Sequence, residues 1–157
     1  MLVRSAVPGD VGAIAACHVA CWREAYAHLV RPAFLAGLDV DDFRVRWAGS
    51  LRDPSRPAWV AEVDAEVVGF SGTCPSRDQP PVRQLELRCL YLRQSRHGSG
   101  LAQQLLDRAL GDVGASLWVA EDNPRAHAFY ARNGFAPDGA RAQLQQMEGL
   151  AEIRLVR

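Results

Sequence analysis

The chain contains no lysine: its 18 basic residues are all arginines, and they are matched by 18 acidic residues. Without lysine it cannot form a Walker phosphate loop, which needs a Gly-Lys-Ser or Gly-Lys-Thr ending. The balanced charge argues against binding to nucleic acid or membrane surfaces through bulk positive charge. No apolar run approaches the length of a transmembrane helix, and no apolar signal region follows Met1. We therefore expect a cytoplasmic protein.

Cysteine is also scarce, and its spacing does not indicate a metal site. The four cysteines, Cys17, Cys21, Cys74 and Cys89, include no Cys-x-x-Cys pair. Cys17 and Cys21 share one face of a predicted helix, with His18 nearby, but no second ligand pair lies elsewhere at a suitable spacing. Free cysteines are common in protein cores. We expect reduced thiols and no metal.

The chain does contain enough apolar material for a single α/β domain over residues 1–157. Hydrophobic residues make up 48% of it and charged residues 23%, as in ordinary globular proteins. Alternating apolar residues predict strands at 1–6, 58–63, 67–74, 84–92, 116–120, 136–141 and 150–156. Helical spacing predicts helices at 11–27, 41–51, 101–110 and between 123 and 134, and Asp10 is the expected N-cap of the first.

The most informative stretch joins the strand at 84–92 to a helix through Gly98-Ser99-Gly100. The first amides of a helix have no internal partner and carry partial positive charge, so this order of elements forms an anion site. A dinucleotide-binding fingerprint would need a third glycine where Gln103 stands. The sequence therefore predicts a pyrophosphate ligand of another kind.

Two motifs resemble those of the GNAT superfamily of N-acetyltransferases. The segment from His97 to Ala102 is similar to the family's acetyl-coenzyme A loop, Arg/Gln-x-x-Gly-x-Gly/Ala, with histidine at the first position. The segment from Asn123 to Phe135 is similar to the family's Asn-x-x-Ala-x-x-Phe-Tyr-x-x-x-Gly-Phe signature. The resemblance implies a mixed, mostly antiparallel sheet of six or seven strands with about four helices. The strands at 84–92 and 116–120 should splay apart.

The same resemblance implies acetyl-coenzyme A as the cosubstrate, held between the splayed strands. The implied contacts are Leu90, Tyr91, Leu92, His97, Gly98, Ser99, Gly100, Leu101, Ala102, Asn123 and Tyr130. Two of them have an alternative. His97 could stay solvated in its loop, and the Asn123 side chain could cap the following helix instead of contacting the cofactor.

Two residues are implied in catalysis. Tyr130 matches the family tyrosine that reaches the coenzyme A sulfur and is the expected general acid, with a core aromatic as the alternative. Glu86 lies on the strand that leads to the glycine loop and is the expected general base. With an ordinary pKa of about 4.3, it would need burial or a water relay to act near neutral pH. The alternative is a solvent-facing residue paired with Arg88 or Arg83.

Trp22 and Tyr26 fall in the family's variable substrate-binding region, and the alternative for both is core packing. The expected reaction transfers an acetyl group to a primary amine of a small molecule or peptide, by direct attack in a ternary complex. No Ser-His-Asp or Cys-His set indicates a covalent intermediate. The alternative function is a catalytically silent acyl-coenzyme A sensor or interaction module. Homodimers are common among relatives, and this chain could form one.

Overall fold

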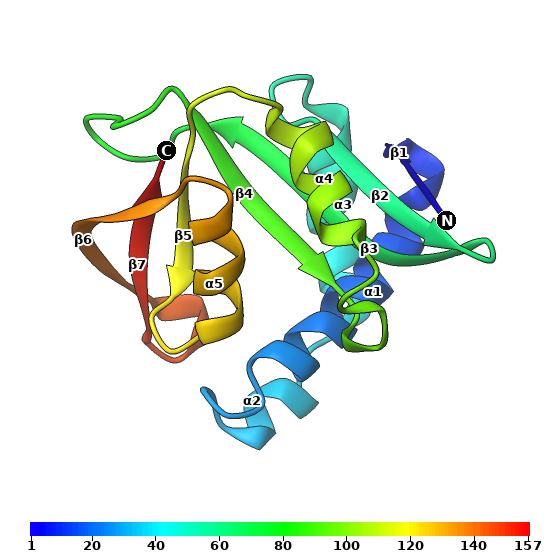
Figure 1. Cartoon of the computed structure of the whole chain (residues 1–157). Coiled ribbons are helices and arrows are strands. Elements are labelled where there is room, and N and C mark those ends of the chain that lie inside the picture. Colours follow the sequence, from blue (N-terminus) through cyan, green and yellow to red (C-terminus); the bar gives the residue numbers. More distant parts are fainter.

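One mixed sheet of seven strands runs through the molecule (Figure 1). The computed structural model describes all residues, 1–157. The strands are β1 (Leu2–Ser5), β2 (Ala58–Val63), β3 (Glu66–Pro75), β4 (Leu85–Leu92), β5 (Ser116–Ala120), β6 (Ala136–Leu144) and β7 (Leu150–Val156). The helices are α1 (Val11–Ala25), α2 (Pro32–Ala36), α3 (Val40–Arg52), α4 (Leu101–Leu110) and α5 (Pro124–Arg132). No helix has the length and hydrophobicity needed to span a membrane.

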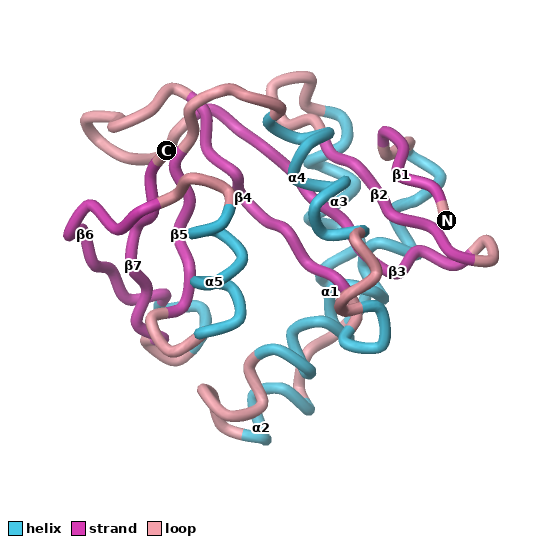
Figure 2. The backbone as a smooth tube through the Cα atoms, viewed as in Figure 1, coloured by secondary structure: helices cyan, strands magenta, loops and turns pink.

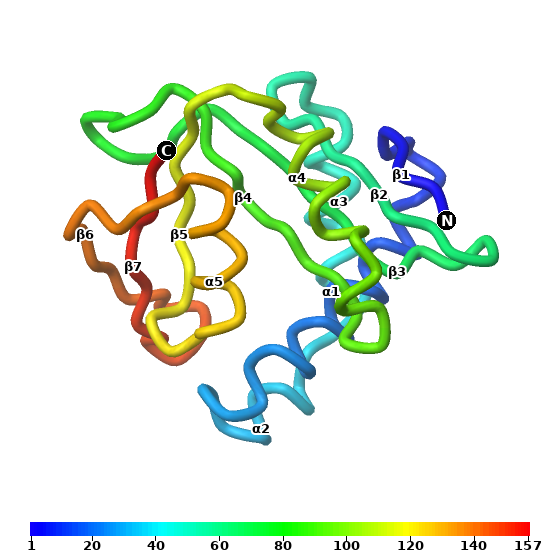
Figure 3. Tube along the Cα trace, in the orientation of Figure 1, coloured from blue at the N-terminus to red at the C-terminus, as the bar shows by residue number.

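The sheet has the strand order β1-β2-β3-β4-β5-β7-β6, and β4 and β5 are its only parallel neighbours. These two strands are paired at a single position, Glu86 with Ser116. Beyond that pair they diverge, as the traces in Figures 1 and 2 show. The predicted mixed sheet with a splayed strand pair is confirmed. Figure 3 shows that β1–β4 come from the earlier part of the sequence and that β5, β7 and β6 come from the later part.

Helices cover both faces of the sheet, with α4 and α5 on one side and α1 and α3 on the other (Figure 2). On the α4 face, Leu101 and Leu105 are fully buried against β1, β2 and β3. On the opposite face, Ile14 of α1 and Phe43 of α3 pack against Phe70 of β3. Each such buried side chain contributes about 1.5–3 kcal/mol to folding. The apolar stripes predicted from helical spacing therefore face the core.

Helix α5 begins and ends where its sequence predicts. The Asn123 side chain accepts a hydrogen bond from the Ala126 amide at 3.2 Å. At the other end Gly134 has a φ of +81°, and the Phe135 amide donates to the Tyr130 carbonyl at 3.1 Å. This is the Schellman ending expected from the glycine. It folds Phe135 back onto Tyr130, whose ring centroid lies 5.6 Å away.

Apart from shifts at element ends, such as β6 running to Leu144 rather than 141, two details differ from the sequence prediction. There are five helices rather than about four, because Pro32–Ala36 forms the short helix α2. Asp10 precedes α1, but its carboxylate does not cap that helix. It accepts hydrogen bonds from the Val7 amide at 2.8 Å and from Arg4 Nη1 at 2.7 Å. Arg4 on β1 therefore binds the carboxylate that the sequence pattern predicted as the N-cap of α1.

Candidate active site

A β-bulge distorts the middle of β4. The pairing of β4 with β3 steps from Cys89 opposite Gly72 to Leu87 opposite Thr73, so Arg88 is an extra residue. A bulge bends its strand and redirects the side chains around it. On its other side, β4 has no partner beyond Glu86. The backbone groups along this open edge are therefore free to pair with an extended ligand.

A cleft of about 450 Å³, here called the β4–β5 cleft, lies beside this open edge. Its walls come from β4, the glycine loop, β5, α5 and the end of α1. They include Leu90, Tyr91, Leu92, His97, Gly98, Gly100, Ala102, Asn123, Phe129 and Tyr130. Nine of the eleven residues expected to contact the cofactor thus surround one cleft. The exceptions are Ser99 and Leu101.

The glycine loop leaves several main-chain amides without an acceptor. Gly98 and Gly100 have φ values of +80° and +83°, a conformation that side chains with a Cβ rarely adopt. No backbone carbonyl accepts from the amides of Gly98, Gly100, Ala102 or Gln103. Together with the start of α4 these amides form a positively polarised cradle. The cradle fits a pyrophosphate group.

The two loop residues outside the cleft wall stabilise the loop from behind. The Leu101 side chain is fully buried between α4 and the sheet, so only its main chain can face a ligand. Ser99 Oγ donates to the Arg96 carbonyl at 2.7 Å. His97 Nε2 lies 3.1 Å from the Leu92 carbonyl, which ties the loop to the end of β4. His97 is therefore hydrogen-bonded within the protein while its side chain stays exposed.

Tyr130 faces the β4–β5 cleft from α5. Its ring is packed between Phe129 and Phe135, with centroids 5.3 and 5.6 Å away. Its hydroxyl has no hydrogen-bond partner in the protein, and the residue as a whole is 7% exposed. Burial raises the pKa of Tyr130 above its usual range. The side chain is thus both a packed aromatic and a protonated donor that faces the cleft.

Asn123 caps α5, which is the alternative to a cofactor contact that the sequence offered for this side chain. The cap uses the side-chain oxygen, and the residue also lines the cleft. The amide nitrogen of the same side chain has no protein partner, so capping and a ligand contact are compatible. Arg125 and Arg132, also on α5, line the cleft without an acidic partner. The motif comparison did not indicate these two cations, which stand where an anionic ligand could use them.

A second cavity, of about 760 Å³, lies on the other side of β4 and is here called the α1–α3 cavity. Its walls come from α1, α3, β4 and the β6–β7 hairpin. Both cavities are lined by Tyr26, Arg88, Cys89, Tyr91 and Trp118. The two cavities therefore adjoin at the bulged part of β4.

The expected acceptor residues, Trp22 and Tyr26, both line the α1–α3 cavity. They are also part of an aromatic cluster: Trp22 meets Phe43 edge-on at 5.2 Å between centroids. The Tyr26 hydroxyl lies 2.8 Å from that of Tyr91. Packing and cavity lining, which the sequence presented as alternatives, occur together in these two side chains.

Glu86 is fully buried and bound to Arg77. Its carboxylate accepts from the Arg77 amide at 3.1 Å and from Arg77 Nε at 3.1 Å, and it also forms an ion pair with the same guanidinium. It lines neither cavity. The alternative of a solvent-facing residue paired with Arg88 or Arg83 is wrong, because the side chain is buried and its partner is Arg77. Whether Glu86 is the base stays a prediction.

Another carboxylate was missed by sequence reasoning. Glu152 on β7 lines the α1–α3 cavity and is half-buried, with no hydrogen bond or ion pair to the protein. Burial raises its pKa, while the charge of Arg77 partly opposes that shift. The only signal in the sequence was its place in the last strand, which says nothing about which cavity the strand borders.

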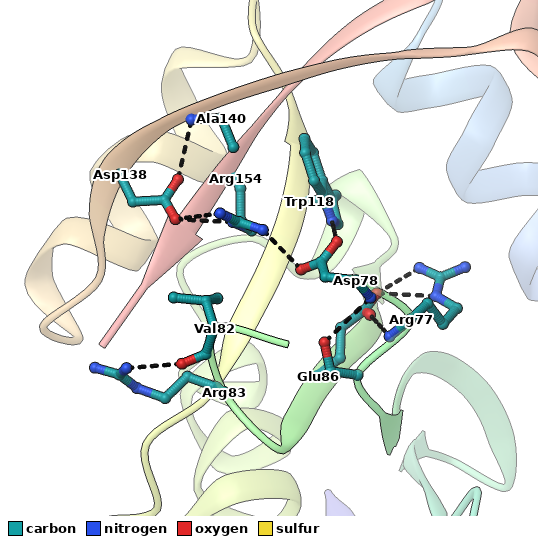
Figure 4. A network of polar contacts seen from close by, with 10 residues as sticks. Arg77, Asp78, Val82, Arg83, Glu86, Trp118, Asp138, Ala140 and Arg154 are labelled. Atoms are coloured by element: carbon teal, nitrogen blue, oxygen red, sulfur yellow. Dashed lines mark hydrogen bonds and ion pairs between the residues drawn. The ribbon is translucent and has the colours of Figure 1, made fainter. Parts of the chain in front are cut away.

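The β3–β4 loop is fixed over the closed end of the splayed strands (Figure 4). Asp78 accepts from Trp118 Nε1 at 3.1 Å and from Arg154 Nη1 at 3.0 Å. Arg154 also pairs with Asp138 at 2.7 Å. This network holds the indole of Trp118 at the boundary of the two cavities.

Comparison with known proteins agrees with this geometry. Residues 22–135 match the model of the acetyltransferase (GNAT) family. The chain belongs to the GNAT family. The probable N-acetyltransferase Rv2775 of Mycobacterium tuberculosis is 26% identical over 153 residues, which cover 94% of this GNAT chain and 87% of that protein. The uncharacterized N-acetyltransferase Rv2669 of the same organism is 35% identical over 119 residues, covering 71% and 74%.

Solved GNAT structures share the fold. The PaiA N-acetyltransferase of Thermoplasma acidophilum, crystallised with coenzyme A, superposes with a TM-score of 0.74 at 15% identity. The match covers 98% of this GNAT chain and 96% of that one. The expected family and fold are thus confirmed, while the roles of individual residues stay predictions.

Proposed function

We propose that this chain transfers the acetyl group of acetyl-coenzyme A to a primary amine by direct attack in a ternary complex. The observation that carries the proposal is the junction of the two cavities: the β4–β5 cleft and the α1–α3 cavity share one wall at the bulge of β4. A donor bound in the cleft and an acceptor bound in the cavity would both contact these shared residues, so their reacting groups would lie close together. Holding them close supplies much of the rate acceleration.

The β4–β5 cleft supports the choice of cosubstrate. The amide cradle at Gly98 and Gly100 fits a pyrophosphate, and Arg125 and Arg132 offer further positive charge. The open edge of β4 can pair with an extended amide-containing arm. The activated thioester supplies the acyl group when bound. Coenzyme A in the related PaiA crystal structure supports the same assignment.

Tyr130 is the proposed general acid. Its free hydroxyl faces the cleft, and its raised pKa keeps the proton in place through the neutral range, available for a leaving thiolate. The base must accept a proton from the amine on the acceptor side. Glu86 would act there only through water, because Arg77 occupies its carboxylate. Glu152 borders the acceptor cavity directly and is the second candidate.

The acceptor is proposed to enter the α1–α3 cavity, against Trp22 and Tyr26. Two classes of acceptor fit the proposal: a small-molecule amine and the amino terminus of a peptide or protein. The elements that form this cavity, α1, α3 and the β6–β7 hairpin, lie largely outside the two sequence motifs. The motifs therefore leave the acceptor open.

Titration with acetyl-coenzyme A, followed by an assay of free-thiol release against a panel of amines and peptides, tests the proposal. We expect binding and acceptor-dependent release of thiol. Binding without release from any acceptor would favour a silent acyl-coenzyme A sensor, and absence of binding would refute the assignment. Because the chain has no lysine, acetylation detected on the protein itself would point to its amino terminus.

A further inference from the structure

The α1–α3 cavity has more positive than negative charge on its walls. Its charged lining residues are Arg46, Arg56, Arg77, Arg88 and Glu152. Arg56 pairs with Asp53 at 3.3 Å, and Arg77 pairs with Glu86. Arg46 and Arg88 have no acidic partner. Two cations of this cavity are therefore uncompensated by the protein.

Arg88 is the more buried of the two. It is the extra residue of the β4 bulge, and its guanidinium carbon lies 5.0 Å from the ring centroid of Trp47. Nη2 donates to Ser50 Oγ at 3.0 Å, and Nε is buried without any partner. Neither the Trp47 ring nor the Ser50 hydroxyl carries a negative charge, so the positive charge of Arg88 is not neutralised. A half-buried cation in this state is stabilised when an anion binds beside it.

Arg46 adds a second cation to this region of the cavity, and His18 adds an uncharged hydrogen-bond donor. Arg46 lies over the Phe43 ring at 5.5 Å and makes no ion pair. His18 Nδ1 accepts from Trp47 Nε1 at 3.1 Å, so its proton is on Nε2, which is buried and has no partner. Burial, followed by the charges of Arg88 and Arg46, lowers the pKa of His18 to about 3. His18 is thus a neutral donor beside two free cations.

We propose that the acceptor amine is a small molecule that also bears an anionic group, a carboxylate or a phosphate, bound beside Arg88 and Arg46. Guanidinium groups bind both anions well. A volume of about 760 Å³ is typical of small-molecule sites, and the aromatic walls suit an apolar body. The inference rests on the proposed function only in assigning this cavity to the acceptor.

Intrinsic fluorescence provides a binding test that needs no turnover, because Trp22, Trp47 and Trp118 line the cavity. The probes are phenylalanine, its phosphonate analogue 1-amino-2-phenylethylphosphonate, and phenethylamine, which has the same amine and ring but no anion. Each is titrated into the protein saturated with coenzyme A. We expect at least one anionic probe to bind tenfold or more tightly than phenethylamine, and the tighter of the two identifies the anion.

The variant Arg88→Gln should abolish most of this preference at saturating coenzyme A, and its affinity for coenzyme A is measured alongside, because Arg88 lines both cavities. Arg56→Gln is the matched control, since it removes a cation of the same cavity that already has an acidic partner. If Arg88→Gln does not fold, Arg46→Gln should reduce the preference instead. Equal or tighter binding of phenethylamine would overturn the inference, and so would a preference that survives in the folded arginine variants.

The two proposals fail in different ways. Selective binding of an anionic probe without any thiol release would contradict the transferase activity and leave the anion site standing. Efficient acetylation of phenethylamine, with no gain from an added carboxylate or phosphonate, would contradict the anion site and leave the transferase standing.

Discussion

The hydroxyl groups of Tyr26 and Tyr91 lie 2.8 Å apart, in the wall that the β4–β5 cleft and the α1–α3 cavity share. Burial raises the pKa of Tyr26 to about 12 and that of Tyr91 well above its ordinary value. Both side chains are therefore protonated near neutral pH, and one donates to the other. The pair connects the end of α1 to β4 between the sites proposed for the two substrates.

Removing either hydroxyl should weaken this connection. We expect Tyr26→Phe and Tyr91→Phe each to lower the free energy of unfolding by about 1 kcal/mol, the usual net value of a hydrogen bond. The double variant should lose clearly less than the sum, because both changes delete the same bond. Urea unfolding of the four proteins measures this coupling. Additive losses would mean that the two hydroxyls do not interact in solution.

The two candidate bases can be separated by one pair of substitutions. Glu152→Gln should lower kcat/KM about 100-fold if Glu152 is the base, with little change in stability, because its carboxylate has no protein partner. Glu86→Gln should instead lower the free energy of unfolding by about 2 kcal/mol, since its buried charge holds Arg77. Steady-state kinetics and urea unfolding of both variants test these expectations. If Glu152→Gln leaves kcat/KM unchanged, Glu152 is not the general base, and Glu86 acting through water remains the candidate.

The pH profile gives an independent check on Glu152. A general base must be deprotonated, so activity should fall as the pH drops through its pKa. Burial raises that pKa above its ordinary value, which moves the acidic limb toward neutrality. The limb should disappear in Glu152→Gln, and an unchanged limb would assign it to another group.

Tyr130→Phe keeps the ring between Phe129 and Phe135 and removes only the hydroxyl. We expect kcat to fall at least tenfold while the affinity for acetyl-coenzyme A and the melting temperature change little. The raised pKa means that wild-type activity should not decline between pH 8 and roughly pH 10 through loss of this proton. Calorimetry and a pH series of rates measure both effects. Turnover that is unaffected at every pH would rule out the acid role.

Gly100→Ala should weaken acetyl-coenzyme A binding. Gly100 has a φ of +83° and opens α4, with nothing within 4 Å of an added Cβ, so the cost is conformational, about 1–2 kcal/mol. Relaxing that strain would turn the amides of the cradle away from their ligand. Gly139→Ala is the matched control, because Gly139 has a φ of +93°, equal free space and a place in β6 outside the β4–β5 cleft. Equal affinities for the two variants would contradict a cradle at Gly100.

Local patterns predicted the elements that local chemistry determines. The α5 segment is the clearest case: Asn123, Pro124 and Gly134 set both ends of the helix within a few residues of sequence. The strands at Ala58–Val63, Ser116–Ala120 and Leu150–Val156 have the predicted bounds, and the first two are buried along most of their length. The short helix α2 was missed, since five residues are too few for a periodic signal.

The partners of individual acidic side chains are what the sequence left open. Asp10 bonds to Arg4 rather than capping α1, and Glu86 bonds to Arg77 rather than to Arg88 or Arg83. With 18 arginines available, spacing alone cannot choose the partner of a given acid. Glu152 and Arg88 became candidates only when the fold brought β7 and the β4 bulge to one cavity.

The single residue pair between β4 and β5 has a consequence for the dynamics of the protein. Backbone hydrogen bonding joins β1–β4 into one unit and β5-β7-β6 into another, and almost nothing but side chains and loop contacts links them. Such units can open with separate free energies, which amide hydrogen exchange resolves. A ligand in the cleft would touch both and slow exchange in β5 together with β4. Binding of the cosubstrate would then couple the opening of the two halves more tightly than their shared apolar cluster does.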